Sequence, residues 1–289
     1  MAQVLLVAVR GLDGRYHGAG DWPPSPARLF QALIAGAGIG GPVPDDVRTA
    51  LQWLEGLPPP IIAAPVATEG QPRFTWYVPN NDLDTVGGDP RRIAEVRAGK
   101  DVRARLFDQE VPWLYAWTHD DVGGEDDRAR AVCSLSERLY QFGRGVDLAW
   151  AWGEVLRNDG ELAQRLMDYP GRVFRPSGTG EGQSLLCPEP GSLKSLLSRY
   201  EAGARRFAMK PPESSRKAGR TFFLQAPKPR FRLVAYDSPP VRRVYELRRP
   251  GAEGSFGSWP LDRTTDLVVR LRDKAAERLR RGLPQRILD

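Results

Sequence analysis

The stretch that decides the fold is residues 4–37, VLLVAVRGLDGRYHGAGDWPPSPARLFQALIAGA. Val4–Arg10 is short, apolar and rich in β-branched residues, and a glycine follows it, which is the pattern of a buried strand. Ser25 is a good helix N-cap, and Pro26 stands at the first helical position, where a missing N–H is harmless. The stretch therefore predicts a strand, a Gly-rich connection and a helix that ends near Ala37.

Strands and helices alternate along the rest of the chain. Apolar periodicity and Gly or Pro breaks predict further helices at about 45–55, 126–142, 161–168, 192–207 and 262–281, and strands at 61–67, 74–78, 111–118, 146–156, 222–225, 231–236 and 241–247. Residues 158–190 are otherwise rich in loop-forming residues. This order of elements predicts an α+β sandwich of ferredoxin type.

A long polar segment separates two of the predicted strands, 74–78 and 111–118. A segment of this length in a compact domain is usually functional or disordered, and it is interpreted here as a hairpin arm flanked by those strands. The middle of the arm is basic, with Arg91, Arg92, Arg97, Lys100, Arg103 and Arg105.

Positive charge is concentrated in the last third of the chain. The 289 residues carry a formal net charge of +6, whereas residues 205–249 alone hold 13 Lys and Arg against three acids. A local excess of this size favours a polyanionic partner such as nucleic acid, through phosphate contacts and counterion release. The alternative is a solvated basic face or loop.

Several kinds of chemistry are excluded by motifs that the sequence lacks. Cys133 and Cys187 are too few and too far apart for a disulfide framework or a C-x-x-C metal site, and reduced thiols are expected. No P-loop, G-x-S-x-G or zinc-spaced histidine pair occurs, and the Gly-rich stretch 36–41 follows a helix rather than a strand. No metal or cofactor is therefore predicted. The apolar runs are too short to cross a membrane, so the protein is expected in the cytoplasm.

His17 and His119 are the only histidines. A metal-independent ribonuclease needs a base, an acid and a group that stabilises the pentavalent phosphate, and His17 with Tyr16 and Arg15 has those chemical types. A hydrogen-bonded loop histidine and an RNA contact without catalysis are the alternatives, and all three stay open on the sequence. His119, at a predicted strand end, is interpreted as structural.

Aromatic side chains that alternate with cations are typical of contacts to single-stranded RNA. On this criterion the candidates are Arg15, Tyr16, Trp22, Arg230 and Arg232. Arg144 is a further candidate, because the glycines on either side of it let a backbone approach RNA closely. Other strand aromatics are expected in the core, namely Trp113, Trp117, Trp150 and Trp152.

Four longer motifs occur in order: GRYH at 14–17 followed by WPPSPARLFQAL at 22–33, ALQWLEGLPPPI at 50–61, YVPNND at 77–82 and FGRGVDLAW at 142–150. In order and spacing they resemble the fused Cas five–Cas six subunit of type I-G (formerly I-U) CRISPR effector complexes. The resemblance covers residues 1 to about 155.

The resemblance implies a ferredoxin-like (RRM-related) domain with a hairpin thumb, in the place of an arm at about 79–118. Such subunits hold the 5′ handle of the CRISPR RNA (crRNA) and cap a filament of Cas seven-type backbone subunits. A Cas eight-type large subunit and target DNA are further candidate partners. The implied domains are 1–250 for handle binding and 251–289 as a linker and basic helix. The family's precursor-cutting nuclease half would follow Asp289, so the cleavage site is expected outside these residues.

The leading hypothesis is therefore a non-catalytic subunit that binds the crRNA handle in antiviral defence. The expected RNA contacts are Arg15, Tyr16, His17, Trp22, the six cations of the arm, Arg144, Arg230 and Arg232. Two alternatives stay open: a metal-independent endoribonuclease that acts from His17 on precursor crRNA, and a protein scaffold without direct RNA contact.

Overall fold

The structure is a computed structural model, and it describes residues 2–18, 22–70, 74–79, 90–120, 125–177, 182–204, 207–209, 221–223, 226–237, 257 and 259–282. The chain divides into two compact units, Met1–Ser238 and Pro239–Asp289. The second unit contains a 3-10 turn, Leu261–Arg263, and the basic helix α6 (Thr264–Gly282). The predicted strand at 241–247 lies outside the described residues.

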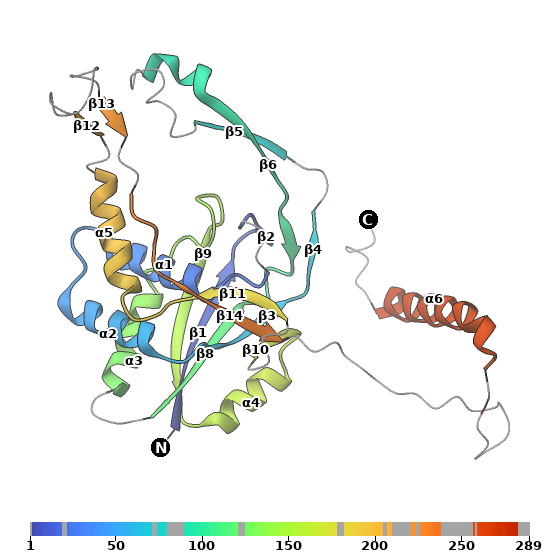
Figure 1. Cartoon of the computed structure of the whole chain (residues 1–289). Helices are drawn as coiled ribbons and strands as arrows, with labels where there is room; N and C mark the ends of the chain where they lie inside the picture. The colour runs from blue at the N-terminus through green and yellow to red at the C-terminus, as the bar shows by residue number, and fades with distance from the viewer. Residues whose placement is uncertain are drawn as a thin grey trace. The chain divides into compact units, whose positions relative to one another are not determined.

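The Met1–Ser238 unit is built on a seven-stranded sheet (Figure 1). All neighbouring strands in it pair antiparallel. From one edge to the other the strands are β11 (Gln183–Cys187), β14 (Arg232–Asp237), β10 (Gly171–Pro176), β3 (Ile61–Pro65), β8 (Trp113–Asp120), β1 (Ala2–Gly11) and β9 (Ala149–Leu156).

Helices cover the two faces of this sheet unequally. The odd-numbered side chains of Leu5–Val9 belong to the main core, into which four helices pack: α1 (Pro26–Ala37), α2 (Asp45–Gly56), α3 (Glu125–Ser136) and α5 (Ser192–Ala204). The even-numbered side chains of Val4–Ala8 belong to a smaller core, to which α4 (Asp159–Met167) contributes Leu162 and Leu166. Because both faces of β1 are buried, its sequence is an unbroken apolar run rather than an alternating one.

The connections form two β–α–β units that interlock. α1 and α2 connect β1 to β3, and α3 connects β8 to β9. In each unit one strand of the other lies between the two connected strands, since β8 separates β1 from β3 and β1 separates β8 from β9. The mixed helix and antiparallel-sheet architecture confirms the predicted α+β class.

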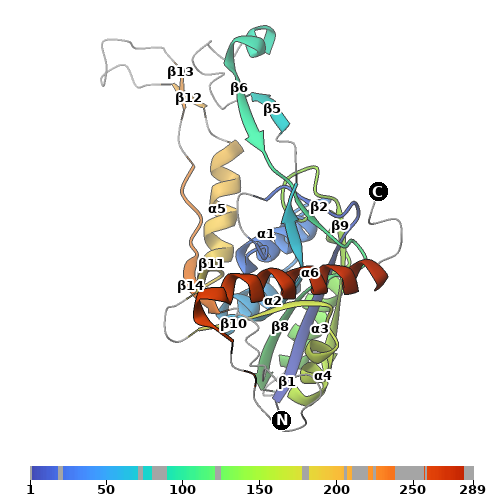
Figure 2. The same ribbon diagram turned by 90° about the vertical axis from the view of Figure 1, so that its right-hand side faces the viewer.

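An arm of two small sheets extends from the central sheet (Figures 1 and 2). At its base β2 (Arg15–Tyr16), β7 (Arg105–Phe107) and β4 (Ala67–Glu69) pair in that order, and further out β5 (Phe74–Pro79) pairs with β6 (Arg97–Val102). The strand predicted near 111–118 was expected to flank the arm on the other side from β5. That strand is β8, which pairs with β1 and β3 instead, because its buried side chains from Trp113 to Trp117 require the central sheet.

Other parts of the structure differ from the sequence prediction. The loop-rich stretch 158–190 contains β10 and β11, which obtain their partners from the distant strands β3 and β14. The helix expected over 126–142 ends at Ser136, and a further hairpin pairs β12 (Phe207–Met209) with β13 (Thr221–Phe223). Trp113 and Trp117 lie in the core as expected, but Trp150 is 44% exposed, because it lies on the face opposite the four helices.

Both cysteines are free thiols, and Cys187 is buried in β11. Burial raises the pKa of the Cys187 thiol to about 11, an effect that Arg232 and a hydrogen bond with Tyr236 reduce in part. Since the thiolate is the reactive form, the native protein at pH 8 holds Cys187 in its unreactive, protonated state.

We expect iodoacetamide at pH 8 to leave Cys187 unmodified in the native protein and to modify it readily in urea, as measured by mass spectrometry of the Cys133→Ser variant. That variant leaves Cys187 as the single thiol. Modification of native Cys187 at the rate seen in urea would contradict the burial of the thiol.

Candidate functional site

A buried carboxylate, Asp147, joins two distant segments at one end of the central sheet. Its Oδ1 accepts a hydrogen bond from the backbone N–H of His17 (2.9 Å) and lies 2.7 Å from His17 Nδ1, and its Oδ2 accepts one from the backbone N–H of Arg144 (2.6 Å). The Asp147 side chain is 4% exposed, so these bonds supply the partners that a buried carboxylate requires. We call these three residues the Asp147 clamp.

The turn that carries Asp147 requires glycine at one position. The backbone N–H of Asp147 donates to Arg144 O (2.8 Å), which folds the turn back on itself. Gly143 has φ +132°, and a Cβ atom there would lie 2.3 Å from Asp147 Oδ2 and 2.9 Å from the Tyr16 ring. Gly143 thus lets the backbone close on the carboxylate, with the half-buried Arg144 beside it.

The same carboxylate orients the His17 ring. A carboxylate only accepts hydrogen bonds, so the hydrogen lies on Nδ1, and Nε2 is the nitrogen left for other partners. The ring centroid of His17 also lies 5.3 Å from that of Trp76 in β5. His17 therefore connects the clamp to the arm, and its Nε2 is a candidate proton acceptor or hydrogen-bonding group.

His119 is remote from this place. Trp113 of β8 pairs with Val9, at the clamp end of β1, whereas His119 pairs with Gln3. Six residues of strand separate Trp113 from His119, a length of about 20 Å. His119 is buried and packs edge-on against Trp53, which agrees with the structural role expected for it.

Tyr16 lies in the core rather than on the surface of the site, and Trp22 packs against it. Tyr16 is 1% exposed, and aromatic rings surround it: Trp113 at 5.8 Å, Trp22 at 6.0 Å and Phe142 at 6.3 Å between centroids. Trp22 is partly buried against the same cluster. The RNA contact expected of Tyr16 is corrected to a packing role, because a base cannot stack on a ring whose faces are covered. Strand alternation in β2 then leaves the neighbouring Arg15 exposed.

At the base of the arm, two predicted cations share one acid. Arg103 Nη1 lies 3.0 Å from one carboxylate oxygen of Glu69, and Arg105 Nη2 lies 3.5 Å from the other. Arg105 is paired across the small sheet with Tyr16 on one side and with Glu69 on the other. Both guanidinium groups are therefore fixed next to the segment that contains Arg15 and His17.

Further out on the arm, the predicted cations are exposed. Arg92 is paired with Glu95 at 2.6 Å, and Arg91 is exposed on the same 3-10 helix. Arg97 and Lys100 are exposed on β6 and make no ion pair with any residue that the structure describes.

Arg230 and Arg232 do not join the clamp. They lie at or next to β14, whereas Asp147 lies just before β9. Four strands, β10, β3, β8 and β1, lie between β14 and β9 in the sheet. Arg230 is paired with Glu189 (2.6 Å), and Arg232 donates to the carbonyl of Leu57 (3.4 Å).

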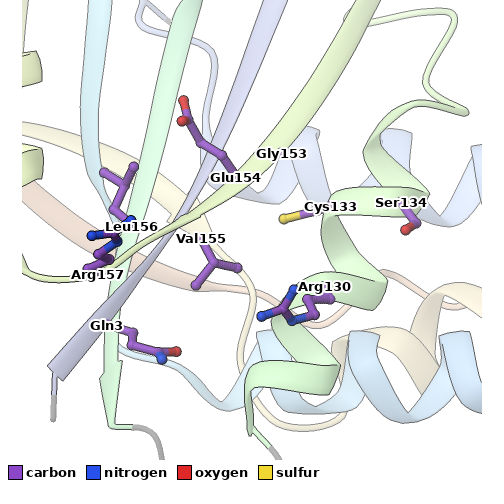
Figure 3. Close-up of a pocket in the computed structure, with 9 residues that line it drawn as sticks. All are labelled: Gln3, Arg130, Cys133, Ser134, Gly153, Glu154, Val155, Leu156 and Arg157. Carbon is purple, nitrogen blue, oxygen red and sulfur yellow. The ribbon is translucent and has the colours of Figure 1, made fainter.

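A pocket of about 600 Å³ lies at the opposite end of the sheet from the clamp, between α3 and the ends of β1 and β9 (Figure 3). The side chains of Gln3 and Arg130 point toward one another across it, and Cys133 points toward β9. One amide, one guanidinium and one thiol do not form a recognisable catalytic set. Nor do the described residues contain any group of three or more metal-binding side chains, or a helix long and apolar enough to span a membrane.

Asp147 and Trp76 are not among the site residues predicted from the sequence. Asp147 stands in the FGRGVDLAW motif, and an acid three residues after Arg144 is the one local signal that the glycine turn closes on a carboxylate. Trp76 lies in a predicted strand, and nothing in the local sequence indicates that it meets His17.

Comparisons with known proteins give a family and a weak structural likeness. The family described as CRISPR-associated protein, GSU0054 family, matches residues 2–235. A solved structure of a CRISPR protein from Archaeoglobus fulgidus is similar with a TM-score of 0.31 and 10% identity, over 83% of this chain and 97% of that one. No curated protein matches the sequence.

We expect Gly143→Ala to destabilise the protein by about 2–4 kcal/mol, because the new methyl group displaces Asp147 from its hydrogen bonds and φ is left-handed. Gly145→Ala is the matched control, since a Cβ there meets nothing closer than Gln141 Nε2 at 4.0 Å. Urea unfolding measures both. Equal stability of the two variants would show that the turn does not close as described.

Proposed function

This chain belongs to the GSU0054 family of CRISPR-associated proteins, and on that basis we propose that it binds the 5′ handle of crRNA as a subunit of a type I effector complex. The observation that carries the proposal is the Asp147 clamp. It holds Arg144 and His17 next to Arg15, at the point where the basic arm leaves the sheet.

The groups around the clamp suit an RNA backbone. Arg15 is exposed and Arg144 is half-buried, and a guanidinium group binds phosphate oxygens with two parallel hydrogen bonds. Gly145 is exposed, so the backbone on that side of Arg144 is accessible at close range. His17 Nε2 adds a hydrogen-bonding group whose orientation Asp147 fixes.

The arm extends this surface with a stacking group and cations. Tyr77 of β5 is 70% exposed and pairs across the strands with Gly99, so Arg97, two residues before Gly99, lies on the same face of the ribbon. An exposed aromatic ring beside a phosphate-seeking cation is the arrangement that grips single-stranded nucleic acid. In the proposed complex, Tyr77 stacks on a base and Arg97 contacts its phosphate, while Lys100, which pairs with Trp76, contacts a phosphate from the other face.

The finer architecture is part of the same proposal. The two interlocked β–α–β units support a ferredoxin-like (RRM-related) domain, and the arm serves as its thumb. We propose a type I-G complex in the cytoplasm with Cas seven-type and Cas eight-type neighbours, in which residues 1–250 bind the handle and residues 251–289 lead toward a nuclease half.

One observation favours a second function, cleavage of precursor crRNA from His17. The Asp147 carboxylate holds the ring so that Nε2 is free to accept a proton, as a general base requires. The described residues near the clamp offer no second histidine as the acid, so binding without cleavage is the better supported reading.

We expect Arg144→Ala and Arg15→Ala each to weaken binding of repeat-derived handle RNA about tenfold, with a shallower salt dependence, because each removes one phosphate contact. Fluorescence anisotropy at several salt concentrations measures both effects. Arg165→Ala is the control, since this arginine lies on α4 and is paired with Glu154 of β9. Unchanged affinity in both variants would favour the scaffold alternative.

We expect purified protein to bind repeat RNA in EDTA without cutting it, and gel analysis of the RNA measures this. Specific cleavage that His17→Ala abolishes, while Arg165→Ala retains it, would establish the endoribonuclease in place of the binding subunit.

A further inference from the structure

The helix α5 stands on a rigid support. The buried carboxylate of Glu55, in α2, accepts hydrogen bonds from the backbone N–H groups of Gly191 (2.9 Å) and Leu193 (2.7 Å) at the helix N-terminus. Ser192 Oγ donates to Arg230 O (2.7 Å), and Ser195 Oγ accepts from Arg230 N (2.8 Å). These bonds fix the first turn of α5 to α2 and to the segment before β14, so the outer face of α5 is held in a defined position.

That outer face carries a shallow groove of about 540 Å³, lined by Leu196, Arg199, Tyr200 and Gly203. Their spacing places the four residues on one side of the helix. Tyr200 is 81% exposed, so nearly the whole ring is available to a ligand. Leu196 packs partly on the core and forms an apolar floor next to it.

The side chain of Arg199 is preorganised to bind an anion at the edge of this groove. Its Nη1 donates to the carbonyl groups of Ala226 (3.3 Å) and Pro227 (2.8 Å), which fixes the direction of the guanidinium group. Its Nε and Nη2 make no hydrogen bond with any other described residue, and the side chain is exposed. A guanidinium held in this way can bind a phosphate without losing much further side-chain freedom.

Gly203 leaves space beside Tyr200 on the same side of the helix. A Cβ atom at this position would meet nothing within 4 Å, so that space is open to a ligand. Its absence of a side chain leaves the helix backbone open beside Tyr200.

The charge around the groove favours a polyanion over a peptide. Lys228 is exposed and directly follows Pro227, whose carbonyl accepts a hydrogen bond from Arg199. A flat exposed aromatic ring beside a fixed arginine is also the arrangement by which proteins hold an unpaired base and its phosphate.

We propose that this face of α5 is a second nucleic-acid contact, which binds one unpaired nucleotide with its base stacked on Tyr200 over Gly203 and its phosphate on Arg199. The nucleotide belongs either to a guide RNA or to a DNA strand, which offer the same chemistry at this face. The contact is separate from the Asp147 clamp, and its test can succeed or fail independently of handle binding.

The full chain is tested with fluorescein-labelled single-stranded RNA and DNA of one sequence, by anisotropy and by photocrosslinking of iodouracil-containing strands with mass spectrometry. We expect crosslinks at Tyr200 and about tenfold weaker binding by Tyr200→Ala, with retention of affinity in Tyr200→Trp. A loss for RNA alone identifies guide RNA as the ligand, and a loss for DNA alone identifies a DNA strand. The same Tyr200→Ala change made in an Arg144→Ala chain separates this contact from the clamp.

Gly203→Ala provides a test that misfolding cannot imitate. We expect this variant to be at least as stable as the native protein and yet to bind several-fold more weakly, because the methyl group blocks the base. Gly56→Ala, at another helical glycine with open space around it, is the matched control. Native affinity of Tyr200→Ala and Gly203→Ala for both strands, with no crosslink at Tyr200, would overturn the proposal and leave this face to a protein partner.

Discussion

The arrangement around the candidate site depends on the hydrogen bonds of one buried carboxylate. A buried charge is costly unless its lone pairs are filled. Asp147 fills them with N–H groups from His17, 130 positions away in sequence, and from the nearby Arg144. One segment leads from β1 into β2 at the arm, and the other is the turn before β9. Breaking these bonds would leave an unpaired charge in the core as well as release the loop. A Cβ atom at Gly143 would lie 2.3 Å from Asp147 Oδ2, so a side chain there is expected to break them.

Much of the fold was predictable where the information is local. The apolar run of β1 and the Ser25-Pro26 start of α1 specify those elements within a residue or two. β10 and β11 were not predictable from the local sequence, since each is a short strand whose hydrogen-bonding partner, β3 or β14, is distant in the chain. Trp150 shows a related limit: its sequence pattern matches that of a core strand, but which face of β9 the helices cover is decided elsewhere in the chain.

The candidate site was also predictable only in part. His17 and Arg144 were predicted from their residue types, whereas Asp147 could not be, because its role appears only when the fold brings the two segments together. Tyr16 was predicted to contact RNA because it stands between Arg15 and His17, yet the alternation of side chains along β2 directs it into the aromatic core. Tyr200 gave no signal at all, because an aromatic residue on an amphipathic helix normally faces the core.

The shared acid at the root of the arm has a consequence for energetics. Arg103 and Arg105 already share an anion, the Glu69 carboxylate, so one of their two positive charges is balanced within the protein itself. In the proposed RNA complex, a phosphate at this point would exchange with the Glu69 carboxylate, and fewer mobile ions would be released into solution than the number of arginines suggests. Binding at the root of the arm would then depend less on ionic strength than binding at two unpaired arginines.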